Sequence, residues 1–271
     1  MKPPDDGLGA GWLDAWPGAL EAWSRATALR EPALFESDAE AAERGMEGEI
    51  AAIRLTDHTV AVNLATVRAR HLEGHALAIL AHEVGHHVYV PASLTDNARL
   101  LAVVGRMLEG TPKSKAGLVA NLYADLLVND RLQRRAGIDV AAVFRVLRVE
   151  EGSAVWKLYT RTYEHLWRLP PASIAPGGVT DELDADALLV ARIVRSFAGE
   201  WLAGARRFAA IVYRYLAEDL LAERGQPFER LGLDDTKGAG RPAPGEDPVS
   251  ALPDGLAALD AAEGELSLIH I

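Results

Sequence analysis

The sequence contains no cysteine. Disulfide bonds, iron–sulfur clusters and thiolate zinc sites are therefore excluded, and histidine and the carboxylates remain as the only strong metal ligands. The chain has 8 histidines and 39 acidic residues. Any zinc that it binds must lie in a shell of histidine, aspartate or glutamate ligands.

Positive charge and long apolar runs are also scarce. Lysine and arginine number 28 against 39 acidic residues, which gives a formal net charge of −11, and no local basic stripe offsets it. Nucleic acid is therefore not an expected partner.

Charged residues or histidine interrupt each apolar stretch before the roughly 18 residues that a membrane span needs, so no membrane partner is expected either. The first residues, Met1 to Gly7, lack the features of a secretory signal, which predicts a cytoplasmic location.

The chain divides into three parts by composition. Apolar residues make up 49% of the 271 residues, enough for a sizeable core, and helical periodicity predicts one domain over 1–224. Over 225–265 glycine, proline and acidic residues dominate, which predicts a disordered acidic linker or tail. Residues 266–271 resemble the translation of a sequencing adaptor, so we expect a non-native terminal segment and a natural chain that continues beyond 265. The alternative is a genuine apolar tail that docks on the body.

Periodicity and breaking residues predict a mainly α fold with one short β-hairpin. The hairpin comprises 50–55 and 59–64 around the polar pair Asp57 and His58, and little other sheet is expected. A helix is predicted from His75 to Val90, where Pro91 ends it. The acidic stretch 31–49 is predicted to be helical and solvated. Further helices are predicted at 17–29, 93–108, 116–135, 139–149, 153–168, 182–198 and 200–224.

The predicted helix after the hairpin contains the motif His82-Glu83-Val84-Gly85-His86. Two histidines four residues apart project from one helix face, about 5 to 6 Å apart at Cβ, as two ligands of one zinc ion require. Glu83 lies at the edge of that face, where its carboxylate can act as general base on a zinc-activated water. The motif predicts Zn²⁺ as cofactor and amide hydrolysis as chemistry. The alternative is a pair of ordinary core or surface histidines.

A third ligand is needed, and Asp125 is the best candidate. It lies on an otherwise apolar face of a later helix, where an unpaired carboxylate would be costly to bury. Asn121 and Asn129 lie one turn to either side and are suited to orient the ligands, while His87 points about 100° away from His86 and is expected to support the site or face solvent. The alternative for Asp125 is a surface ion pair with Arg131 or a lysine.

Two segments together carry a resemblance to a known family. The run His82-Glu83-Val84-Gly85-His86-His87, followed by Asn121 to Asp130, resembles the predicted metallopeptidase domains encoded beside MoxR-type AAA+ ATPases and von Willebrand A proteins in bacteria. The resemblance covers residues 12–220 and is strongest over 50–148. It implies a zincin-like helical domain and a bacterial zinc hydrolase, with a MoxR-type AAA+ ATPase and a von Willebrand A protein as partners. It supplies no substrate.

The chain departs from the broader gluzincin pattern at the third ligand. That group has a glutamate there and an acid four residues later, whereas this chain has Asp125 and Asn129. The third ligand therefore stays open, with three acids at the start of a later helix as fallback ligands, although acids are favoured in a first helical turn by the dipole alone. The fallback ligands are Glu182, Asp184 and Asp186.

A donor to the carbonyl oxygen is also expected in such a site. The residues considered for this role, each of which could equally be a packing residue, are Tyr123, Tyr159, Tyr163 and His165.

These features predict a zinc-dependent peptidase that acts on a peptide or protein substrate. The alternative is a non-catalytic adaptor, in which zinc braces the helices and the surface binds the ATPase or the von Willebrand A partner. A structural site is closed by a fourth protein ligand, whereas a catalytic site keeps one position open. Glu83 favours the peptidase, because a purely structural site has no use for a base at that position.

Overall fold

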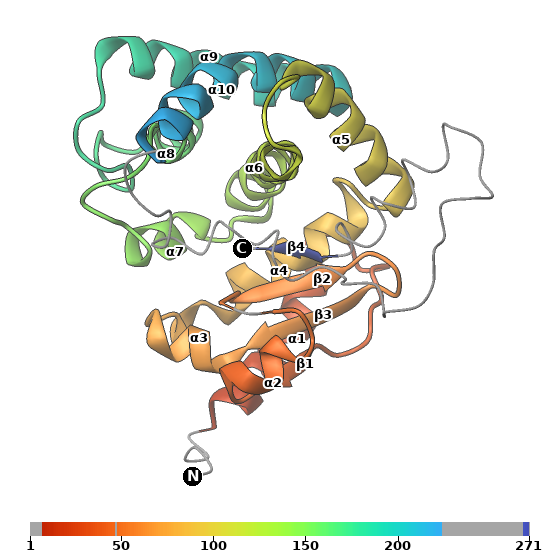
Figure 1. The fold of residues 1–271 in the computed structure, drawn as a ribbon. Helices are drawn as coiled ribbons and strands as arrows, with labels where there is room; N and C mark the ends of the chain where they lie inside the picture. Colours follow the sequence, from red (N-terminus) through yellow and green to blue (C-terminus); the bar gives the residue numbers. More distant parts are fainter. Residues whose placement is uncertain (1–6, 47, 224–267, 271) are drawn as a thin grey trace, which may run out of the picture.

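A computed structural model describes residues 7–46, 48–223 and 268–270, and its fold is mainly α, as predicted. Figure 1 shows a small sheet with α1, α2 and α3 in one part of the molecule, a group of longer helices in the other, and α4 between them. The elements in chain order are α1 (Leu8–Glu21), β1 (Ala33–Phe35), α2 (Asp38–Ala42), β2 (Ala51–Arg54), β3 (Thr59–Asn63), α3 (Leu64–Ala69), η1 (Glu73–His75), α4 (Ala76–Val88), α5 (Leu94–Met107), α6 (Lys113–Arg131), η2 (Leu132–Ala136), α7 (Val140–Val146), α8 (Ala154–Trp167), α9 (Asp181–Ser196), α10 (Trp201–Glu223) and β4 (Leu268–His270).

The predicted hairpin is confirmed and forms the centre of the sheet. Strands β2 and β3 pair antiparallel, with Ala52 opposite Ala61, and Asp57 lies in the turn between them. The Asp57 carboxylate accepts a hydrogen bond from the backbone N–H of Thr59, which closes the turn. The hairpin brings β2 alongside α4, and the two elements pack against each other.

The sheet is larger than predicted, because two further strands flank the hairpin. Its order is β1-β3-β2-β4, with β1 parallel to β3 and β4 antiparallel to β2. β4 comes from the segment 266–271, and Ile269 pairs with Ile53. Residues 268–270 therefore lie against the body, while the non-native origin of 266–271 stays a prediction. The linker predicted at 225–265 lies outside the described residues.

The prediction for the first fifty residues is wrong in two places. Helix α1 begins at Leu8 rather than at 17 and includes Pro17, because Trp12 and Trp16 bury their rings against the body through its first turns. The stretch 31–49, predicted to be helical, holds strand β1 and only a five-residue helix α2. Backbone pairing with β3 outweighs the local preference of this acidic stretch.

The remaining helices follow the prediction closely. Ser93 caps α5 by accepting a hydrogen bond from the N–H of Asp96, as the capping pattern indicates. The helix over 116–135 is found as α6 followed by one π-helical turn, η2, and it ends at Gly137 in a left-handed conformation. Within the described residues, no helix has the length and apolar character needed to cross a membrane.

Helix α4 lies at the centre of the fold, between α1 and the sheet on one side and α6 on the other. Trp23, which follows α1, donates a hydrogen bond from its indole N–H to the carbonyl of Ala81 on α4. A Cβ at Gly85 would lie 2.4 Å from the Trp23 ring and 2.6 Å from Val128 on α6. Only glycine at position 85 lets these helices approach so closely, and this approach brings α6 opposite the two histidines of α4.

Candidate metal centre

Helices α4 and α6 bring His82, His86 and Asp125 together in a buried cluster whose ligand atoms all lie within 4.8 Å of one another. The Nε2 atoms of the two histidines are 2.9 Å apart. Oδ1 of Asp125 lies 3.2 Å from Nε2 of His86 and 3.5 Å from Nε2 of His82. This cluster could hold a metal ion.

The hydrogen bonds behind the two imidazoles fix their tautomers. Nδ1 of His86 lies 2.8 Å from the carbonyl of Val90, and Nδ1 of His82 lies 2.7 Å from Oδ1 of Asn129. Both partners are acceptors, so each Nδ1 carries the hydrogen and each Nε2 presents a lone pair to the cluster.

Two imidazole lone pairs and a carboxylate oxygen therefore point at one another in a buried space. Such an arrangement is unfavourable unless a proton or a metal cation lies among them. Burial lowers the pKa of His86, which disfavours an added proton there. A divalent cation fits the donor set best, and two nitrogens with one carboxylate oxygen form a common ligand set for zinc.

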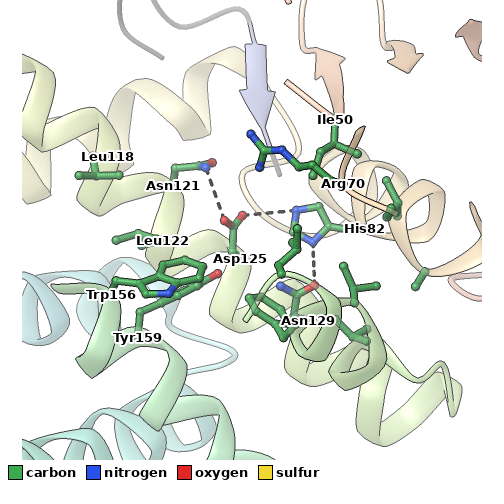
Figure 2. Close-up of a pocket in the computed structure, with 16 residues that line it drawn as sticks. Ile50, Arg70, His82, Leu118, Asn121, Leu122, Asp125, Asn129, Trp156 and Tyr159 are labelled. Carbon is green, nitrogen blue, oxygen red and sulfur yellow. Dashed lines mark hydrogen bonds and ion pairs between the residues drawn. The ribbon is translucent and has the colours of Figure 1, made fainter. Parts of the chain in front are cut away.

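Asp125 is 6% exposed, and both oxygens of its carboxylate have neighbours in the site. Burial by itself raises the pKa of this carboxyl, but the neighbouring His82 and His86 lower it by more, so that its pKa lies below the usual range. Its other oxygen, Oδ2, accepts a hydrogen bond from the amide of Asn121 at 3.4 Å (Figure 2). Asp125 therefore stays ionised and faces the histidines, rather than pairing with Arg131 at the surface.

A chain of buried hydrogen bonds supports His82 from behind. Asn129 accepts from His82 and donates from its amide nitrogen to the hydroxyl of Tyr163 at 2.8 Å. That hydroxyl lies 2.8 Å from the hydroxyl of Tyr159, which lines a cavity beside Asp125. Burial raises the pKa of both phenols well above the usual value of 10.0, so both stay protonated.

Glu83 is fully buried, and among the described residues neither of its oxygens has a hydrogen-bond partner of normal geometry. Burial raises the pKa of this carboxyl well above its usual range, and the negative charge of Asp125 raises it further, while the backbone of Ile53 on β2 lowers it in part. An unpaired buried carboxyl beside three potential ligands is costly for folding. Such a group is a candidate for proton transfer.

The other candidates from the sequence lie elsewhere. The ring of His87 contacts that of His58 on the hairpin turn, with centroids 4.2 Å apart. The fallback ligands form ion pairs across helices: Glu182 and Asp186 with Arg214, and Asp184 with Arg161 and His165. Tyr123 packs against Phe208 of α10. Of the four proposed donors, Tyr159 is the one that lines the cavity next to the cluster.

The structure also reveals two features that no pattern in the sequence predicts. One is the carbonyl of Val90, a backbone acceptor that orients His86. The other is a mainly apolar cavity that is lined by His82 and Asp125 and, from other elements, by Phe144, Trp156 and Arg70. The last three come from α7, α8 and the end of α3, so only the packing of the chain brings them to the cluster.

A scan of the chain against models of protein families found no match, and searches of curated proteins and of solved structures found none either.

Proposed function

We propose that this chain is a zinc-dependent peptidase, with His82, His86 and Asp125 as metal ligands and Glu83 as general base. The observation that carries the proposal is the convergence of two Nε2 lone pairs and an ionised carboxylate next to an unpaired, buried Glu83. A bound zinc ion would lower the pKa of a water molecule and polarise a substrate carbonyl.

Glu83 would perform the proton transfers. Its carboxylate accepts a proton from the water that attacks the amide carbon, and the same carboxyl then gives the proton to the departing amine. The raised pKa suits the first step, because a carboxylate with a raised pKa is a stronger base than an ordinary glutamate. Tyr159, protonated and beside Asp125, is the candidate donor to the carbonyl oxygen.

The edge of β2 supports a peptide as the substrate. β4 adds to this edge as a short antiparallel strand through backbone pairing, and Ile53, in the middle of that pairing, also lies against Glu83. An extended peptide that pairs with a strand edge in this way gains affinity from main-chain hydrogen bonds. This edge would present a substrate amide next to the base.

Metal content and cleavage of a mixed peptide library test the proposal together. The wild-type protein should bind one equivalent of zinc and cleave peptides. His82→Ala and Asp125→Ala should lose both zinc and activity, whereas Glu83→Gln should keep zinc and lose activity. His75→Ala, at the start of the same helix, is the matched control and should keep both.

Two outcomes would redirect the proposal. Zinc retained in Asp125→Ala would place the third ligand elsewhere. Zinc bound by a wild-type protein that cleaves nothing would favour a non-catalytic adaptor braced by metal. The association with a MoxR-type AAA+ ATPase and a von Willebrand A protein rests on the resemblance and stays a prediction.

A further inference from the structure

The cavity beside the metal cluster has the walls of a side-chain pocket. Its volume is about 100 Å³. A water molecule needs on the order of 10–15 Å³ of such space, so the cavity is large enough for several waters or for one sizeable side chain. Leu122, Val143, Phe144 and Trp156 contribute apolar or aromatic surface to it. An apolar occupant fits these walls better than water does.

The cavity opens directly onto the proposed ligands. His82 and Asp125 are themselves part of its lining, as is Tyr159 (Figure 2). A side chain that occupies the cavity would therefore belong to a residue next to the bond held at the cluster. Its fit would set which bond is cleaved, in the way that a pocket beside the reacting bond selects substrates.

Arg70 adds a charge to this otherwise apolar lining. Its guanidinium lies on the same side of the cavity as the His82 ring in Figure 2, and it donates a hydrogen bond to the carbonyl of Gly48 at 3.3 Å. Among the residues that the structure describes, no carboxylate forms an ion pair with it. By contrast, Arg68, two residues earlier in the chain, forms an ion pair with Glu36 at 3.1 Å.

Arg70 differs from the exposed arginines of the chain by its place in the lining of a mainly apolar cavity. Arg70 is half-buried, and burial lowers the pKa of its guanidinium. A guanidinium in such a place binds carboxylates well, because its planar set of donors matches the two oxygens and little water competes. This lining therefore joins an apolar part to a part that carries a positive charge.

We propose, on the basis of the peptidase function above, that the site selects a peptide whose large apolar side chain fills the cavity and whose carboxylate pairs with Arg70. The carboxylate has two possible sources. It is either the C-terminal carboxylate of the apolar residue itself, which would make the enzyme trim chain ends, or the side chain of a neighbouring aspartate or glutamate.

Binding of four labelled pentapeptides to the zinc-loaded Glu83→Gln protein, followed by fluorescence anisotropy, tests this proposal without requiring turnover. The first peptide ends in phenylalanine with a free carboxylate, and the second is its C-terminal amide. The third is that amide with glutamate before the phenylalanine, and the fourth is the free acid with alanine in place of phenylalanine. Each is also measured with Arg70→Gln added, and with Arg99→Gln, an exposed arginine of α5, as the matched control.

We expect the phenylalanine acid to bind about 10- to 100-fold more tightly than the alanine acid, since the cavity buries the ring. The acid should bind about 10-fold or more tightly than the amide, and Arg70→Gln should abolish that difference while Arg99→Gln leaves it. Tight binding of the glutamate amide would identify the side chain as the source, and weak binding would identify the chain terminus.

Equal binding of acid and both amides, equal binding of phenylalanine and alanine peptides, or no binding at all would overturn the proposal. The wild-type cleavage assay distinguishes failure of the pocket proposal from failure of the peptidase proposal. Cleavage that is indifferent to Arg70 and to the apolar residue would refute the pocket and leave the peptidase standing. Charge- and ring-dependent binding without cleavage by the wild type would refute the peptidase and leave a peptide-binding pocket.

Discussion

At the scale of single residues, the ring orientations of the two histidines in the candidate metal cluster depend on the oxygen atoms that accept from their Nδ1 atoms. Asn129 holds His82 at 2.7 Å and is itself held by Tyr163. Replacement of Asn129 by leucine should weaken zinc binding by about 10- to 100-fold, because the Nδ1 tautomer and the ring orientation of His82 are no longer fixed. Competition with a zinc-binding dye measures the affinity.

The loss must be separated from a folding defect. The metal-free Asn129→Leu protein should keep a cooperative thermal transition and the helical circular dichroism of the wild type. Tyr213→Phe, which removes a hydroxyl from an exposed position of α10, is the control and should bind zinc as the wild type does. Unchanged affinity in a folded Asn129→Leu protein would remove Asn129 from the site.

Glu83 predicts a pH dependence of stability. An acid with a raised pKa in the folded state holds its proton there after the unfolded chain has lost it, so stability falls as pH rises from the usual 4.5 towards the folded value. Metal-free Glu83→Gln should therefore be more stable than metal-free wild type at pH 7, by on the order of 1 kcal/mol or more.

The advantage of Glu83→Gln should shrink as pH falls and disappear below pH 4.5, where Glu83 is protonated in both the folded and the unfolded wild type. Denaturant unfolding at several pH values measures it. The same difference at every pH would show that packing, not ionisation, causes the effect.

At the scale of elements, the approach of α4 to its neighbours is set by Gly85. A methyl group there would overlap Trp23 on one side and Val128 of α6 on the other. Gly85→Ala should destabilise the protein by about 1–3 kcal/mol, as overpacking of a core does. Chemical denaturation gives the change in the free energy of unfolding.

A second substitution identifies the cause. Trp23→Leu removes the ring nearest to the added methyl, so the cost of Gly85→Ala should be smaller in the Trp23→Leu background than in the wild type. Additive effects of the two substitutions would contradict a direct clash between these positions.

Elements with strong local signals were predicted well, and elements that depend on distant partners were not. The hairpin, the helix that carries His82 and His86, and the helix capped by Ser93 are all present near their predicted bounds. Strand β1 was missed, because Ala33 to Phe35 is a strand only through its pairing with β3, almost thirty residues later. Periodicity within a segment carries no information about such pairing.

At the scale of the whole molecule, metal binding should act as a stabilising ligand. The cluster brings two Nε2 lone pairs and a carboxylate oxygen together, so zinc would remove a repulsion of the folded state as well as bind to it. Free zinc at about 100 times the dissociation constant should add roughly 2.7 kcal/mol, which corresponds to an increase in Tm on the order of 5–10 °C.

The increase should be reversed by a chelator and should decline as pH falls, because protons compete for the Nε2 atoms. Differential scanning calorimetry measures it with and without zinc. Asp125→Ala should show a much smaller increase, and an equal increase in that variant would mean that the stabilising zinc binds elsewhere.

The sequence by itself determined the kind of ligand set that this chain can offer to a metal ion. The absence of cysteine, the spacing of His82 and His86 on one helix and the acid between them depend only on residue identity and on the geometry of an α-helix. Asp125 could be nominated in the same way, since a lone acid on an apolar helical face needs a partner.

Only the tertiary structure decided which groups surround the candidate ligands and Glu83. One such feature is the carbonyl of Val90 behind His86, a backbone atom that every residue has. Two others join segments that are far apart in the chain: the β2 edge against Glu83, and the cavity with Arg70 in its lining. No local pattern marks such contacts. They arise because few arrangements of α4, α6, α7 and α8 bury the apolar faces of all four helices. The arrangement that is adopted then fixes the positions of the polar groups on these helices.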